Sequence, residues 1–232
     1  MVCGIDGCRA GWFAVFLHDS GWKTAVYPDL KTFWDDKGQA VSSVLIDIPI
    51  GYPSGPDERN CDRAARAALG RRASSIFRVP CREALYCQTY HEANMISRLH
   101  TGKGLSRQTF NIMPKMREAD QLFKAFPSAK KVCRESHPEL CFVTISANNI
   151  VHGKASESGF RERCEILASI SAKAMQIVEH SLKNYLRKDV ARDDIADALV
   201  LAICAQSSLT KSLPETPEYD SSILKMEIVY PV

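Results

Sequence analysis

The sequence predicts a β-sheet covered by helices, in the α/β or α+β class. Three short β-like segments come first, a continuously apolar segment follows, and long helical patterns lie near the C-terminus. The 232 residues are 45% hydrophobic, which is enough to build a substantial core. We expect one domain over residues 1–232, in which residues 51–130 form a largely helical insertion or cap.

The first predicted strands are short and closely connected. Residues 1–6, 12–17 and 23–28 carry apolar runs, and the turn signal HDSG separates the second run from the third. Such short connections suit antiparallel neighbours. Residues 42–53 form a longer apolar run, which favours a strand buried on both faces.

Helical patterns dominate the remainder. Residues 57–70 predict a helix ended by its final glycine, and residues 160–186 predict one long amphipathic helix. A last helix begins near Asp193. We expect a further strand within residues 130–143 and a short edge strand in the Pro-containing tail, residues 212–232.

The composition excludes several classes of protein. A formal net charge of +3 is too small to argue by itself for a polyanionic partner. The nine cysteines contain no C-x-x-C pair, which disfavours a zinc site or a disulfide framework and fits reduced thiols in the cytosol. No secretory leader pattern precedes the first strand, and the longest apolar run, IADALVLAICA, is too short to span a bilayer. We therefore expect a cytoplasmic protein that does not enter the membrane.

Aspartates within apolar sequence are the strongest chemical signal. Asp6 ends VCGID, Asp47 ends VLID, and Asp197 lies inside IADALVLAI. A buried, ionised carboxylate normally acquires a partner, a proton or a metal, although a strand-end aspartate also accepts hydrogen bonds from the following turn. Asp194 lies three positions before Asp197, on the same helical face, whereas Asp193 points elsewhere and is a credible N-cap.

Convergence of Asp6, Asp47, Asp194 and Asp197 would create a metal site. Clustered carboxylates repel one another, so at least one pKa should rise without a cation. Hard oxygen ligands favour Mg²⁺ or Mn²⁺, and two such ions about 3.5–4 Å apart can activate water and stabilise the leaving oxygen of a phosphodiester. The alternative for the helical pair is that acids in a first turn complement the helix dipole, which explains Asp197 poorly.

These motifs resemble the ribonuclease-H-like superfamily, especially the bacterial Holliday-junction resolvases. In that family one acid ends strand one, a second lies on strand four, and a D-x-x-D pair opens the last helix. The resemblance implies these roles for Asp6, for Asp47, and for Asp194 with Asp197. Resolvases carry glutamate where this chain has Asp47, and the insertion that follows has no counterpart in them.

More closely, the chain is similar to the bacterial family of predicted ribonuclease-H-like nucleases numbered 429 among domains of unknown function. The matching stretches are GIDGCRAGW, DIPIGYP, NCDRAARAALGRRASSIFRVP, GKGLSRQTFNIMPKMREAD, ESHPELCF and DDIADAL. The resemblance implies a five-stranded mixed sheet of order 3-2-1-4-5 flanked by helices, with the helical insertion after strand four.

Two further residues are candidates for the same site. Glu135 is a candidate ligand, although a charged residue near a strand end is usually solvated. His137 is a candidate general acid or phosphate contact. A structural role before Pro138 explains His137 equally well.

The insertion carries a basic cluster suited to phosphate oxygens. The candidate nucleic-acid contacts are Arg59, Arg63, Arg66, Arg71, Arg72, Arg78, Arg82 and Lys115. Nearby acids leave a second interpretation open, a solvated helix with internal salt bridges.

The main functional prediction is a metal-dependent nuclease acting on DNA or RNA. An enzyme acting on symmetric junctions would need to be a homodimer. The alternatives are a non-catalytic nucleic-acid-binding protein and a nucleotide-binding protein on the same fold. The chain lacks the second lobe of sugar kinases and actin-like ATPases, and its early glycines do not form G-x-G-x-x-G.

Overall fold

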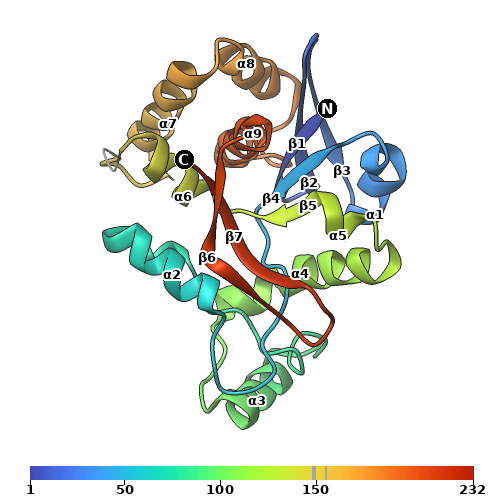
Figure 1. Cartoon of the computed structure of the whole chain (residues 1–232). Coiled ribbons are helices and arrows are strands. Elements are labelled where there is room, and N and C mark those ends of the chain that lie inside the picture. The colour runs from blue at the N-terminus through green and yellow to red at the C-terminus, as the bar shows by residue number, and fades with distance from the viewer. Residues whose placement is uncertain (148–149, 155) are drawn as a thin grey trace. The chain divides into compact units, whose positions relative to one another are not determined.

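A computed structural model describes residues 1–147, 150–154 and 156–232, and its largest sheet has five strands in the order β3-β2-β1-β4-β5 (Figure 1). Strands β1 (Val2–Cys8), β2 (Gly11–His18) and β3 (Gly21–Tyr27) are antiparallel neighbours. Strands β4 (Ser43–Ile46) and β5 (Cys133–Glu135) continue the sheet in parallel with β1. The predicted mixed sheet, with its ribonuclease-H-like topology, is confirmed.

The tight turn between β1 and β2 depends on Gly11. This residue has φ +130°, and a Cβ there would lie 2.1 Å from the carbonyl oxygen of Tyr27 on β3. Only glycine accepts both this backbone conformation and this close approach. The turn therefore folds β2 back beside β1 while leaving room for the third strand.

Among the described residues, five helices accompany this sheet within the first of two compact units, residues 1–47, 131–211 and 229–232. They are α1 (Leu30–Phe33), α6 (Pro138–Ile145), α7 (Glu157–Ile170), α8 (Ala174–Asn184) and α9 (Arg192–Gln206), with a π-helical turn at Trp34–Gly38. Helix α9 packs mainly against the central strand β1.

The prediction of one long helix over residues 160–186 is wrong. Helix α7 ends at Ile170, and Ser171 has an extended backbone (φ −147°, ψ 117°) before α8 begins at Ala174. The amide of Ser171 still donates to the carbonyl of Leu167, which closes the last turn of α7. Serine disfavours helix interiors because its hydroxyl competes for backbone hydrogen bonds. The apolar periodicity continues through this break, so the periodicity alone did not reveal it.

The second compact unit contains residues 48–130 and 212–228. Its helices are α2 (Asn60–Leu69), α3 (Tyr90–Thr101) and α4 (Arg107–Ala125), with a 3₁₀ turn at Gly70–Ser75 after α2. The short helix α5 (Ala129–Val132) spans the boundary between the units. The predicted helical region after strand four is confirmed, whereas the assignment of a single domain stays a prediction.

The C-terminal tail forms more structure than one edge strand. Strands β6 (Thr210–Tyr219) and β7 (Lys225–Pro231) pair with each other in a separate two-stranded sheet. Val229 also makes an isolated parallel bridge to Ser136, the residue after β5. The edge-strand prediction therefore identified β-structure in the tail but not its pairing.

Two expectations from composition can be compared with this fold. No disulfide joins the nine cysteines, all of which are described and buried. Within the described part of the chain, no helix is long and apolar enough to cross a membrane.

Candidate metal centre

Asp6 is positioned by the central strand of the sheet. It lies on β1 opposite Phe13 of β2, and only 8% of its surface is exposed. Its Oδ1 accepts a hydrogen bond of 2.7 Å from the amide of Gly7. The donor belongs to the same strand and not to the following turn, and it engages only one of the two carboxylate oxygens.

Asp47 follows the neighbouring parallel strand. Its amide donates to the carbonyl of Ile5 at 3.0 Å, which extends the β1–β4 ladder by one residue beyond Ile46. Asp6 and Asp47 thus follow paired residues at the carboxyl ends of adjacent parallel strands. This register brings the two carboxyl groups to the same edge of the sheet.

The helical pair lies at the start of α9. Asp194 Oδ2 accepts a 2.8 Å hydrogen bond from the amide of Ala191, the N-cap residue, and Asp197 is 2% exposed one turn later. The expectation that Asp193 is the N-cap is wrong, because the helix begins at Arg192 and Asp193 lies inside its first turn. Asp194 therefore supplies the terminal hydrogen bond from within the helix.

The four aspartates influence one another electrostatically. Burial raises the pKa of Asp6 well above its usual range, and the charges of Asp47 and Asp197 raise it further. Burial likewise raises the pKa of Asp197, and raises that of Asp194 to about 6. Among the described residues no three acidic, histidine or cysteine side chains are already arranged as a set of metal ligands. The aspartates are therefore close neighbours rather than a preformed cage.

Lys154 is a cation that the sequence analysis missed. Its Nζ lies 2.8 Å from Asp197 Oδ2. The carboxylates of Asp197, Asp6 and Asp47 raise the pKa of the ammonium group above its ordinary value, so Lys154 stays charged. In the sequence it stands in the polar stretch VHGKAS, where no periodicity or motif separates it from a solvated loop lysine.

The comparison with protein families covers a stretch of the chain that includes all four aspartates. Residues 4–219 match the family model described as "Protein of unknown function (DUF429)". The chain belongs to the DUF429 family. No curated protein and no solved structure gave a match. The resemblance to family 429 is confirmed, whereas the resemblance to Holliday-junction resolvases stays a prediction.

In this DUF429 member, Glu135 and His137 lie beside β5. Glu135 ends that strand opposite Ile46 and is 5% exposed, so the expectation of a solvated side chain is wrong. His137 is the N-cap residue of α6, directly before Pro138 at the first helical position, where proline is favoured. A role for either side chain in the metal centre stays a prediction.

Several predicted phosphate contacts belong to the second unit's own interior. Arg59 is 1% exposed, and its guanidinium donates to Asp62 and to the carbonyl of Ile50. Arg82 pairs with both Asp120 and Asp220. These two arginines therefore stabilise the second unit, because buried carboxylates already accept hydrogen bonds from their guanidinium groups.

The other predicted contacts differ in exposure. Arg66 is half-buried and pairs with Glu58 at 2.8 Å, in agreement with the salt-bridged interpretation. Arg63 and Arg71 are exposed, whereas Arg72, Arg78 and Lys115 are partly buried. Binding of nucleic acid by these five residues stays a prediction.

Proposed function

We propose that this DUF429 protein is a divalent-metal-dependent nuclease that hydrolyses phosphodiester bonds of DNA or RNA. One observation carries the proposal: Asp6 on β1 of a ribonuclease-H-like sheet lies within electrostatic range of Asp47 after β4 and of Asp194 and Asp197 on α9. Burial and nearby carboxylates raise the pKa values of Asp6, Asp194 and Asp197, so a bound cation would stabilise their charged forms.

The donor set fits Mg²⁺ or Mn²⁺. Asp6, Asp47, Asp194 and Asp197 offer hard carboxylate oxygens, the ligands that both ions prefer, and they would hold the metal. When bound, a divalent ion would act as a Lewis acid on the phosphate and lower the pKa of an attacking water. The Gly7 amide orients Asp6, and the Ala191 amide orients Asp194. Two of the four carboxylates are thus held by main-chain donors before any ion arrives.

The test is cleavage by purified protein of labelled single- and double-stranded DNA and RNA with Mn²⁺. Asp6→Asn keeps the acceptor for Gly7 but removes the charge, so we expect at least about a 100-fold loss of rate, from about 3 kcal/mol of lost transition-state stabilisation. Asp193→Asn is the control: it removes an acid in the first turn of α9 that is not one of the four aspartates, and it should retain cleavage. Cleavage that is equal in Asp6→Asn, or that persists in EDTA, would contradict the proposal.

The ion pair between Lys154 and Asp197 favours a second candidate, a nucleic-acid-binding protein without catalysis. An internal ammonium offsets part of the cluster's charge and thereby reduces the need for a metal. Titration with Mn²⁺ separates the two functions. Metal binding with cleavage supports the nuclease, whereas nucleic-acid binding without Mn²⁺ binding at millimolar concentration supports the second candidate.

A further inference from the structure

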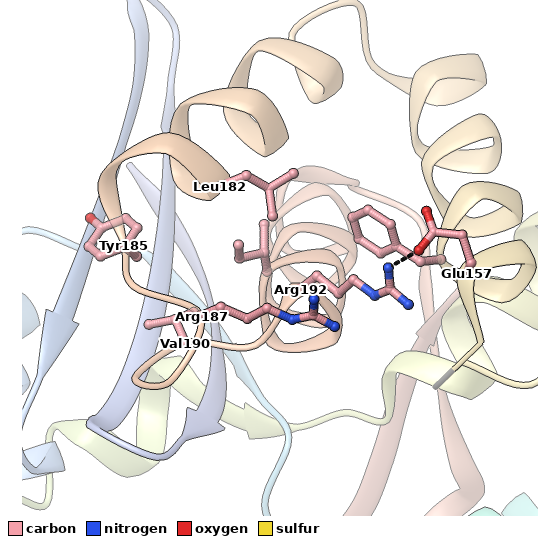
Figure 2. Close-up of a pocket in the computed structure, with 8 residues that line it drawn as sticks. Glu157, Leu182, Tyr185, Arg187, Val190 and Arg192 are labelled. Carbon is pink, nitrogen blue, oxygen red and sulfur yellow. Dashed lines mark hydrogen bonds and ion pairs between the residues drawn. The ribbon is translucent and has the colours of Figure 1, made fainter.

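A small pocket opens between the first turn of α9, the loop before it, and helices α7 and α8 (Figure 2). Its volume is about 280 Å³, just below the ~300–1,000 Å³ typical of ligand pockets, so its occupant must be small. Its lining combines apolar and cationic side chains. This combination is specific enough to define a class of ligand.

Two arginines supply the cationic part of the lining. Arg192 forms an ion pair with Glu157, and its guanidinium lies 5.3 Å from the centre of the Phe160 ring. Arg187 extends across the pocket towards Arg192 (Figure 2) and makes no hydrogen bond or ion pair with any described residue. With one glutamate against two arginines, the lining has a net charge of +1. Arg187 thus offers its guanidinium donors to an anion.

The apolar part of the lining is formed mainly by Phe160 and Leu182. Leu182 is 48% exposed and projects into the pocket (Figure 2). Tyr185 also lines the pocket, and its ring is fixed against the sheet by a 3.0 Å hydrogen bond to Thr24 and an edge contact with Phe13. A flat, weakly polar group can therefore contact this wall while an attached anion reaches the arginines.

The pocket borders the aspartate cluster along the chain. Arg192 begins α9 two positions before Asp194, and the carbonyl of Asp189 accepts a 3.1 Å hydrogen bond from Ala10, in the turn after β1. Both connections lead to elements that carry the aspartates. The pocket and two of the aspartates thus share α9, but Arg192 and Asp194 project from different sides of that helix.

We propose that this pocket binds one nucleotide of a single-stranded nucleic acid, with its phosphate on Arg187 and Arg192 and its unpaired base against Phe160 and Leu182. The phosphate needs a guanidinium fork, and the base needs an apolar wall that a paired base could not reach. The choice of a nucleic-acid strand as the ligand rests on the proposed function. Binding itself requires neither a metal nor cleavage.

The test measures fluorescence anisotropy of labelled single-stranded DNA and RNA in EDTA at several salt concentrations. Arg187→Ala should weaken binding about tenfold at low salt and reduce the salt slope by about one. Arg187→Lys should recover part of the loss. Lys188→Ala is the matched control, because it removes the same charge from the next exposed residue, outside the pocket lining.

A second variant tests the apolar wall. Leu182→Ala should weaken binding of single strands and leave duplex binding unchanged. Equal losses in Arg187→Ala and Lys188→Ala, or no loss in Arg187→Ala, would overturn the proposal. A free mononucleotide that competed as tightly as a strand would also overturn it, because the site would then serve a metabolite.

These experiments distinguish failure of the pocket proposal from failure of the nuclease proposal. Cleavage that depends on Asp6, with normal strand binding by Arg187→Ala, refutes the pocket alone. Strand binding that depends on Arg187, without cleavage by the unaltered protein, refutes the nuclease alone.

Discussion

Asp194→Asn should stabilise the metal-free protein at neutral pH. The folded protein raises the pKa of Asp194 from an ordinary value of 3.8 to about 6, first because of burial and then because of the charges of Asp193 and Asp197. That difference corresponds to about 3 kcal/mol of unfavourable free energy for the charged form, at about 1.4 kcal/mol per pH unit. Because the side chain is only partly buried, solvent screening reduces the expected gain to about 1–2 kcal/mol.

The pH dependence gives the sign of this effect. Between pH 3.8 and about 6, the folded state binds a proton at Asp194 that the unfolded state releases, so this group makes the protein more stable as the pH falls. Asparagine cannot titrate, yet it retains an acceptor for the Ala191 amide. The advantage of the variant should therefore be complete above pH 7 and vanish near pH 4.

Urea unfolding in EDTA at pH 7.5, 6 and 4.5 measures this difference directly. Asp193→Asn is the control in the same helix turn, and its gain should be smaller because it acts on Asp194 only at a distance. A variant that is no more stable than the unaltered protein at pH 7.5 would refute the reasoning. A gain that stays constant down to pH 4 would refute it equally.

Three other substitutions test the packing and the ion pairs. Gly4→Ala should cost about 3 kcal/mol or more in urea unfolding, because its Cβ would lie 2.1 Å from a backbone nitrogen of α9. Gly153→Ala is the control and should be nearly neutral, because open space surrounds that position. Equal effects of the two substitutions would exclude the close contact. Arg59→Met should cost about 3–5 kcal/mol of unfolding free energy, because it leaves Asp62 buried without its partner. The double variant Arg59→Met with Asp62→Leu should recover most of this loss. A double variant as unstable as the single one would show that the ion pair itself stabilises the fold. Lys154→Met should tighten Mn²⁺ binding in calorimetry because it removes a competing cation; unchanged or weaker binding would show that the ammonium does not compete.

Local patterns accounted for the sheet better than for the elements that depend on distant contacts. The apolar runs of the first four strands and their short turns were enough to predict a sheet covered by helices, because each run reflects burial at its own position. The mixed order of its strands was implied only by the family resemblance. The break at Ser171 left the apolar period intact, so no local signal marked it. The pairing of β6 with β7 joins segments of the tail whose partner no periodicity reveals.

The residues of the candidate site could likewise be predicted only in part. Asp6, Asp47 and Asp197 could be found because an acid within apolar sequence is unusual and needs a physical explanation. Lys154 could not, because its role depends on a neighbour 43 positions away. Arg59 was misread for the opposite reason: its helical spacing suggested an exposed face, although Asp62, three positions later, is the partner that buries it.

The contact at Gly4 determines how rigid the candidate centre is. The main chains of β1 and α9 touch there, so Asp6, two residues along the strand, and Asp197, one residue before Ala198 on the helix, are carried by a single stiff scaffold. Their separation is therefore set by backbone and cannot be tuned by exchanging core side chains. Lys154 instead reaches the centre at the end of four methylene groups. The centre thus combines two aspartates held at a fixed separation with a lysine ammonium group that can move away from them by rotation of its side-chain bonds.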